Sequence, residues 1–177
     1  MSSKKSFPDI ANPLIRIILG KLGETYDIER GFTPFTASIK QKQELLQFFN
    51  FQCCYCGVTL TTKTISQDHL IPQNRNAVGL HAWGNVAPCC SDCNSKKHKK
   101  SWESYLLEVC LGDTNLFNDR KQKLIEFIKH YRYEYIVTDE LQQWFDKTYK
   151  DAILFATGFI DSKMGEYINN FTNTNKC

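Results

Sequence analysis

Two short cysteine-rich stretches decide how this chain folds. Residues 53–56 read Cys-Cys-Tyr-Cys, and residues 89–93 read Cys-Cys-Ser-Asp-Cys, so each stretch contains a C-x-x-C pair. A C-x-x-C pair in a tight turn presents two thiolates to one ion, and two such turns complete a tetrahedron around Zn²⁺. The spacing therefore predicts a structural zinc site, with buried structural cysteines or one redox pair as the alternatives. The expected zinc ligands are Cys53, Cys56, Cys90 and Cys93.

Four further cysteines lie outside these pairs. Cys54 and Cys89 flank them directly, so a ligand set shifted onto either residue stays open. Cys110 lies in the mostly apolar run 105–111, where a buried thiol is expected, and Cys177 is expected to be a free thiol. Many cysteines would suit disulfides in a small secreted domain. However, residues 1–13 carry Pro and Asp where a signal peptide needs an apolar run, so we expect a cytoplasmic protein that uses cysteines for metal binding.

The composition is that of a folded protein with an ordinary core. The chain has 177 residues, 42% hydrophobic and 23% charged, which excludes an intrinsically disordered chain. The uncharged apolar stretch 152–160 is too short to cross a bilayer, so no membrane partner is expected. The net charge is only +3, so any nucleic-acid binding must come from local clustering of basic residues.

The apolar pattern divides the chain into three parts. Helical spacing predicts helices over 37–50 and over 13–26, the latter through the stripe Leu14, Ile18, Leu19, Leu22 and Tyr26. After residue 101 two further helical stripes follow: Phe117, Leu124, Phe127, Ile128 and Tyr131, and then Leu141, Trp144, Phe145 and Tyr149. Thr138 is an expected N-cap. Between the first two helices and these stripes, a Cys-, Gly-, Thr- and Asn-rich stretch contains short β-prone pieces at 57–60 and 64–67. We therefore expect a mainly helical α+β fold. Its parts are an N-terminal helical segment (1–51), a central zinc-stapled ββα module (52–100) and a C-terminal helical region (101–177) that packs on the module as one domain.

The insertion between the two cysteine pairs carries residues suited to metal binding and acid–base chemistry. Asp68 and His69 place an oxygen ligand beside a base, and Asn94 follows the last cysteine at the start of an expected helix. Adjacent strand residues point to opposite faces, so Asp68 and His69 need a strand end or a bulge to serve one site. His81 and His130 have no such neighbours and are interpreted as structural.

The order of these motifs resembles a known family. Cys-x-x-Cys, Asp-His-x-x-Pro, Asn-Val and Cys-x-x-Cys-Asn-x-x-Lys follow one another over about residues 52–100. This succession is similar to the HNH family of ββα-metal nucleases, in the branch whose finger is held by a four-cysteine zinc. The last motif position is Asn94 rather than His, a variant that the family accommodates. The flanking helices carry no resemblance.

The resemblance implies a role for each motif residue. His69 would be the general base that activates the attacking water, and Asn85 would fix the loop and orient His69. Asp68 and Asn94 would hold one Mg²⁺, or Mn²⁺, at the scissile phosphate. The Cys₄ zinc would be purely structural. His98, four residues after Asn94, is the alternative ligand, and its imidazole would shift the preference toward Mn²⁺, Co²⁺ or Ni²⁺.

A basic cluster follows the last cysteine pair. Between Lys63 and Lys100 there are six Lys or Arg residues against two acids, a local excess larger than the net charge of the whole chain. A solvated helix face is the alternative, but the position favours contacts to DNA phosphates. The expected nucleic-acid contacts are Lys96, Lys97, His98, Lys99 and Lys100.

These features predict a metal-dependent endonuclease acting on DNA, of a restriction or phage-defence type. The alternatives are a zinc finger that binds nucleic acid without cutting it, a nicking nuclease of a mobile element, and a toxin-like nuclease with an immunity partner. A binding module needs neither Asp68 nor His69, which argues against the first alternative. Two-strand cutting would need a homodimer, and a defence role would bring partner proteins. The sequence leaves the recognition site, the oligomeric state and the pathway open.

Overall fold

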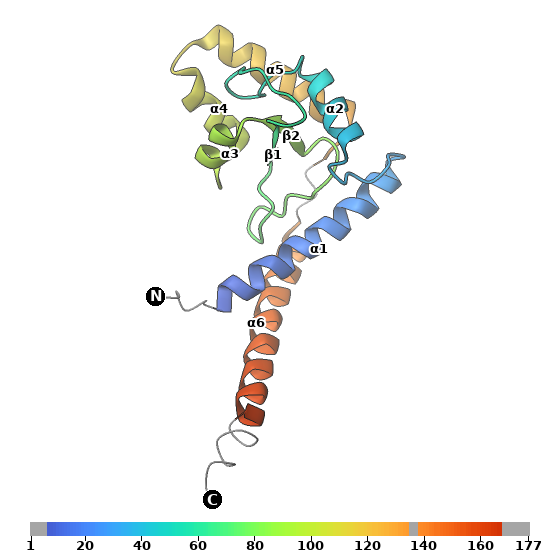
Figure 1. The fold of residues 1–177 in the computed structure, drawn as a ribbon, viewed down its shortest axis with the longest axis vertical. Helices are drawn as coiled ribbons and strands as arrows, with labels where there is room; N and C mark the ends of the chain where they lie inside the picture. The colour runs from blue at the N-terminus through green and yellow to red at the C-terminus, as the bar shows by residue number, and fades with distance from the viewer. Residues whose placement is uncertain (1–6, 135–137, 168–177) are drawn as a thin grey trace, which may run out of the picture.

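The structure is a computed structural model that describes residues 7–134 and 138–167. In these ranges a two-stranded antiparallel sheet lies among six helices (Figure 1), as expected for a mainly helical α+β fold. The elements in chain order are α1 (Phe7–Glu29), α2 (Ile39–Phe48), β1 (Ser66–His69), β2 (Val86–Cys89), α3 (Ser91–Lys97), α4 (Trp102–Cys110), α5 (Thr114–His130) and α6 (Asp139–Tyr167).

The sheet and α3 form the centre of the molecule. β1 pairs with β2 so that Ser66 lies opposite Cys89 and His69 opposite Val86, and α3 begins directly after β2. The β-prone piece 57–60 forms only one isolated bridge, between Gln52 and Thr59, rather than a strand. β1 also begins later than expected, because Thr61 and Thr64 hydrogen-bond to each other and close a turn before it.

Local signals set the limits of α1 and α2. α1 extends beyond the expected 13–26 in both directions, and its buried face is Ala11, Ile15 and Leu19. Of the expected stripe Leu19 is buried, whereas Leu14 and Leu22 are exposed. α2 is shorter than the expected 37–50. Its start is fixed by a capping box between Ser38 and Gln41, and positive φ angles at Asn50 and Phe51 follow its end.

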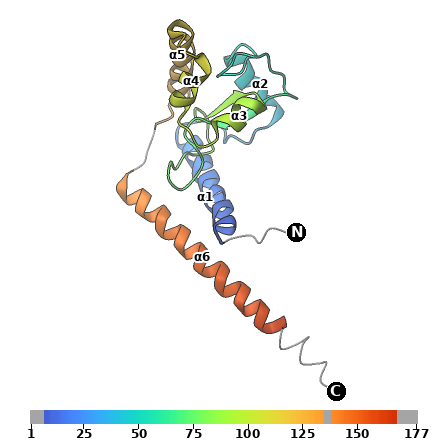
Figure 2. The ribbon, with the colours of Figure 1, turned by 90° about the vertical axis from the view of Figure 1, so that its left-hand side faces the viewer.

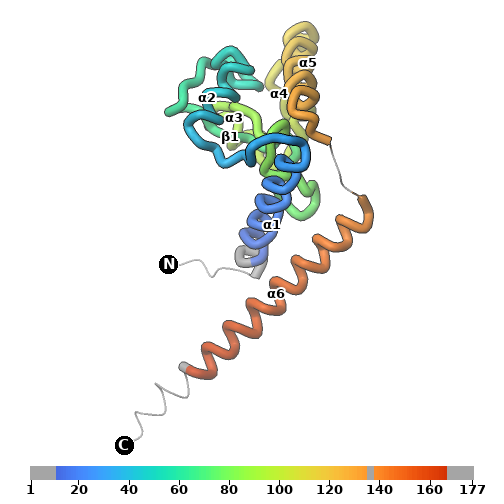
Figure 3. The backbone as a smooth tube through the Cα atoms, turned by 90° about the vertical axis from the view of Figure 1, so that its right-hand side faces the viewer, coloured from blue at the N-terminus to red at the C-terminus, as the bar shows by residue number. Residues whose placement is uncertain are grey.

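Two apolar cores hold the elements together. The larger one joins α2, the sheet, α4 and α5 around Leu46, Val86 and Phe127. The smaller one lies where α1 packs on the first half of α6, through Ile15, Phe145 and others. Beyond that contact α6 continues away from the other helices (Figures 2 and 3). The central module therefore shares its core with α2, α4 and α5.

The expected helical stripes of the C-terminal region are only partly buried. In α5, Leu124 and Phe127 are buried as expected, whereas in α6 Trp144 is 48% exposed, so its place in the buried stripe was wrong. Thr138 caps α6 as predicted, since its hydroxyl accepts a hydrogen bond from the Leu141 amide at 3.3 Å. None of the described helices combines the length and the apolar character that crossing a bilayer requires.

Candidate functional site

The two cysteine pairs meet at one point of the structure. The sulfur atoms of the four predicted zinc ligands all lie within 4.8 Å of one another. A tetrahedral zinc with bonds of about 2.3 Å separates its sulfur ligands by about 3.8 Å, and the Cys56 and Cys90 sulfurs are 3.7 Å apart. The donor set and its spacing therefore fit Zn²⁺. The ligand set shifted onto Cys54 or Cys89 is not seen, because neither residue belongs to this cluster.

Backbone amides support the cysteine cluster. The Cys90 amide donates to Cys53 Sγ, and the Cys93 amide donates to Cys90 Sγ, each at 3.4 Å. A hydrogen bond from the Cys54 thiol, together with backbone amides, lowers the pKa of Cys53 despite its burial. Donors directed at a sulfur favour its thiolate form, which is the form that binds a metal.

Asp68 is buried and held by two other buried side chains. Its carboxylate accepts a hydrogen bond from the Tyr55 hydroxyl at 2.7 Å and lies 3.0–3.1 Å from the Lys97 ammonium. Burial raises the pKa of Asp68, while Lys97 and Tyr55 lower it. A carboxylate offers about four lone pairs, of which these contacts use three, so one remains for an ion.

His69 lies at the end of β1 and contacts a second histidine. Its Nε2 is 3.0 Å from Nδ1 of His81, while in the described part of the chain no protein group hydrogen-bonds to its Nδ1. Burial, and then the charges of His81, Lys97 and Arg16, lower the pKa of His69 to about 3. The ring is therefore neutral over the working pH range, as a base must be. His81, interpreted from the sequence as structural, is a direct neighbour of the predicted base.

The two asparagines take different positions. The buried Asn85 amide bridges the loop, accepting from the Ile71 amide at 2.8 Å and donating to the carbonyls of Ile71 and Leu80. It thus fixes the segment after His69, and within the described residues its side chain makes no hydrogen bond with the His69 ring. Asn94 donates to Ser66 Oγ at 2.8 Å, and among the described residues nothing hydrogen-bonds to its Oδ1, which is left for a ligand.

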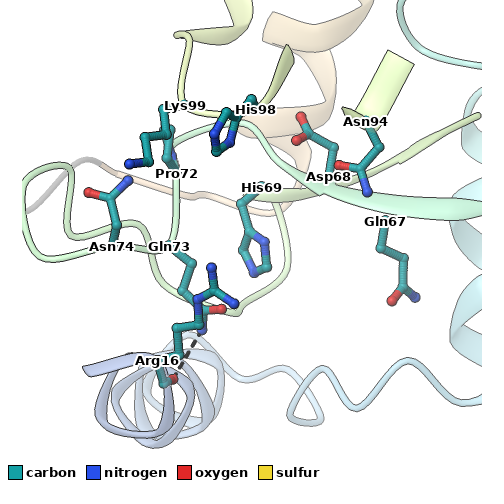
Figure 4. A pocket seen from close by; sticks show the side chains of 10 residues that line it. All are labelled: Arg16, Gln67, Asp68, His69, Pro72, Gln73, Asn74, Asn94, His98 and Lys99. Carbon is teal, nitrogen blue, oxygen red and sulfur yellow. Dashed lines mark hydrogen bonds between the residues drawn. The ribbon is translucent and has the colours of Figure 1, made fainter. Parts of the chain in front are cut away.

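Asp68, His69 and Asn94 line one pocket of about 310 Å³. Figure 4 shows them with His98 and Lys99 on one side and Arg16, from α1, on the other. His98 ends α3 with a positive φ, so it does not continue the helical face of Asn94. The pocket thus combines two oxygen donors, a neutral imidazole and basic groups, a set that suits a hard divalent ion and a phosphate.

The structure divides the predicted lysine cluster. Lys97 is fully buried, and its ammonium donates to Asp68 and to the His69 carbonyl, so its predicted phosphate contact was wrong. Lys96 and Lys100 are exposed but paired with Asp92 and Glu108. Only His98 and Lys99 of the cluster line the pocket. Arg16 was missed because it lies far away in the sequence, on a helix with no motif.

The fold and the site define a class: a ββα module with a cysteine-held metal site and an Asp-His pair beside an asparagine. Comparison with known families agrees, since residues 53–105 match the family described as HNH endonuclease. Residues 53–105 thus correspond to an HNH endonuclease module, and the four-cysteine cluster fits the branch of that family with a structural zinc.

One curated relative extends the similarity beyond the module. The chain is 25% identical over 100 residues to the "SPbeta prophage-derived putative HNH endonuclease YoqL" of Bacillus subtilis (strain 168). The alignment covers 53% of this chain and 42% of the relative, so the chain spans less than half of that protein's length.

Proposed function

We propose that this protein is a metal-dependent endonuclease that hydrolyses phosphodiester bonds in DNA. The observation that carries the proposal is that Asp68, His69 and Asn94 line one pocket, in which no described protein group hydrogen-bonds to His69 Nδ1. The HNH module supplies the nuclease class; DNA as the substrate and hydrolysis by this chain are the proposal.

Each residue has a distinct role in the proposed reaction. His69 Nδ1 takes the proton from the water that attacks the phosphorus. Asp68 and Asn94 hold one divalent ion, Mg²⁺ or Mn²⁺, through oxygen atoms. When bound, that ion neutralises charge on the phosphate and on the departing oxygen. Asn85 fixes the loop after His69, through its hydrogen bonds to Ile71 and Leu80.

The zinc has no part in the proposed chemistry. Zn²⁺ on the four cysteines ties the turn at residues 53–56 to the start of α3, and so holds β1 and β2 beside α3. A four-cysteine site leaves no open coordination position for a substrate. Removal of zinc should therefore abolish activity only through unfolding of the module.

One observation favours the second candidate, a zinc module that binds nucleic acid without cutting it. The Asp68 carboxylate already pairs with Lys97 and Tyr55, and a divalent ion must share it with the ammonium. The neutral His69 beside it argues for catalysis, because binding alone needs no buried base.

Plasmid cleavage separates the two candidates. Supercoiled plasmid is incubated with the full, zinc-loaded chain in Mg²⁺, in Mn²⁺ and without either ion. His69→Ala should reduce metal-dependent cleavage by roughly 10²–10⁴-fold, and Asn94→Ala should abolish cleavage supported by Mg²⁺. His98→Ala should cost much less and leave the metal preference unchanged. His130→Ala is a matched control, since His130 packs on Phe48 and Tyr131 away from the pocket. Metal-independent binding with no cleavage would favour the second candidate.

The biological setting is also a proposal. One such site cuts one strand, so a monomer nicks supercoiled DNA before linearising it, whereas cutting both strands in one encounter requires a homodimer. The exposed Leu154, Phe155 and Phe159 of α6 support a dimer. Light scattering beside the nicked-to-linear time course tests it, and a monomer that only nicks would contradict it. We also propose a restriction or phage-defence role in the cytoplasm, with partner proteins.

A further inference from the structure

The basic side chains near the site differ in whether they are neutralised. Lys96 and Lys100 form ion pairs at 2.9 and 2.5 Å, and Lys97 is buried against Asp68. By contrast, Arg16, Arg75 and Lys99 have no ion-pair partner among residues 7–134 and 138–167. Beside the site, the cations without an ion-pair partner are therefore these three residues, which come from three separate parts of the chain.

The three free cations line one continuous groove. The pocket that contains Asp68 and His69 adjoins a second cavity of about 270 Å³, and Arg16, Gln73, Asn74 and Lys99 line both. The second cavity continues past Arg75 to Tyr149 of α6. Asp68 is the sole acidic residue that lines either cavity in the described part of the chain. The groove thus leads from the reaction site along a positively charged path.

The walls of the groove are held in place. The Arg75 guanidinium lies 4.3 Å from the centre of the Tyr149 ring, and Gln142 donates to the Arg75 carbonyl at 2.7 Å. Gln73 donates to the Arg16 carbonyl at 3.2 Å, which ties the loop to α1 (Figure 4). α1 and α6 lie outside residues 53–105, so the HNH module supplies only one side of the groove.

We propose that this groove binds the DNA backbone on one side of the scissile phosphate, with Arg16 and Lys99 at its entrance and Arg75 on a flanking phosphate. The inference rests on the proposed function and adds a substrate path built by α1 and α6. Paired lysines gain little from a phosphate, because they must first release an acid, whereas free cations displace only counterions. We therefore expect Arg16 and Arg75 to make the phosphate contacts that the sequence predicts for Lys96 and Lys100.

DNA binding without added Mg²⁺ or Mn²⁺ tests the groove without turnover and leaves the zinc in place. Fluorescence anisotropy of a labelled duplex oligonucleotide is measured against the full chain over a NaCl series. Arg16→Gln, Arg75→Gln and Lys99→Gln should each weaken binding and reduce the slope of log affinity against log salt by about 0.9. Arg75→Lys keeps the charge and should keep the slope. Lys96→Gln and Lys100→Gln are the matched controls, with slopes near that of the wild type.

The possible failures are distinguishable. Groove variants with the slope of the wild type, or controls that change it equally, would overturn the groove, even if the protein cuts DNA. A wild-type chain that binds through the groove but never cuts would leave the groove standing and refute the nuclease. A wild-type chain that does not bind the duplex would refute the groove as a DNA path.

A second observation, independent of the groove, concerns His81. Its Nδ1 lies 3.0 Å from Nε2 of His69. The His81 ring packs edge-on against Phe35, with centroids 5.2 Å apart, and its backbone lies against Gly23 of α1, where an added Cβ would collide with it. His81 is thus held against the predicted base by α1 and by the loop that follows it, both outside residues 53–105.

This contact decides which nitrogen of His69 carries the proton. If His69 Nε2–H donates to His81 Nδ1, the Nδ1 of His69 keeps its lone pair and can accept a proton from water. If His81 donates instead, His69 carries its proton on Nδ1 and cannot act as a base there. We infer that His81 is a positioning residue that accepts from His69 and fixes its base-competent tautomer.

Two readouts test His81. His81→Phe removes the acceptor and keeps a ring, whereas His81→Asn offers an amide oxygen near the position of Nδ1. We expect His81→Phe to lower kcat by about 10–100-fold with unchanged DNA affinity, and His81→Asn to restore much of it. Nitrogen NMR of the imidazoles should show that His69 Nδ1 carries no proton in the wild type and in His81→Asn. In His81→Phe it should show a mixture of the two His69 tautomers. A protonated Nδ1 in the wild type, or equal NMR spectra of His69 in all three proteins, would overturn the inference whether or not the protein cuts DNA.

Discussion

Lys97 offers the sharpest test of how the centre of the module is held together. Its ammonium is fully buried, donates to the His69 carbonyl at 2.7 Å and lies 3.0–3.1 Å from the Asp68 carboxylate, which is itself almost inaccessible. Removing one partner of a buried ion pair leaves the other charge without compensation. Lys97→Met should therefore lower the free energy of unfolding by about 3–5 kcal/mol, a large share of the roughly 5–15 kcal/mol typical of a domain.

A double-mutant cycle checks this interaction. Urea unfolding of the zinc-loaded chain is measured for Lys97→Met, Asp68→Asn and the double variant. Asp68→Asn keeps an oxygen for the Tyr55 hydroxyl, so the double variant should lose less than the sum of the single losses, by at least about 1 kcal/mol. Lys96→Met, in an exposed pair with Asp92, is the control and should have a far smaller effect. Additive losses, or a Lys97→Met no less stable than Lys96→Met, would refute the reasoning.

Further predictions concern the zinc, the loop and the pH dependence. Elemental analysis should find about one Zn²⁺ per chain, and Cys90→Ser should abolish zinc binding and unfold the module. A wild-type protein that is folded but contains no zinc would contradict this prediction. Gly79→Ala should cost about 1–3 kcal/mol in urea unfolding, since its Cβ would collide with the Ile71 carbonyl, whereas Gly20→Ala meets nothing and should not destabilise. Burial lowers the pKa of His81, against the opposing charge of Glu24. Folding therefore disfavours protonation of His81. Its neutral form contributes to the stability of the fold above about pH 6.5, the ordinary pKa of histidine, and this contribution is lost as the pH falls toward the lower pKa of the folded state. His81→Asn should flatten this acid dependence, and an unchanged pH profile would contradict it.

The sequence predicts the central module well because its constraints are local. A C-x-x-C pair fixes two sulfurs within one turn, and the order of motifs from Cys53 to Lys97 matches the family over one continuous stretch. The cysteine cluster and the common pocket of Asp68, His69 and Asn94 follow from that order. Likewise, capping residues such as Thr138 mark helix starts through contacts a few residues away.

Long-range contacts set the features that the sequence does not predict. The sequence pattern groups Lys97 with three other lysines that are expected to be exposed. Its burial depends on an ion pair with Asp68, which lies on another element. His81 has no motif around it, and its role follows from a contact with a strand that ends twelve residues earlier. Arg16 reaches the pocket only because α1 lies beside the loop after β1. The separate sequence signals of these residues carry no information on such contacts.

The measurement that tests the proposed function most directly is the cleavage of supercoiled plasmid by purified, zinc-loaded protein, with and without Mg²⁺ and with His69→Ala beside the wild type. The account predicts nicked, then linear, DNA only with the added divalent ion, and a rate roughly 10²–10⁴-fold lower for the variant. Cleavage by His69→Ala at the wild-type rate, or no cleavage by wild-type protein that binds the plasmid, would contradict it.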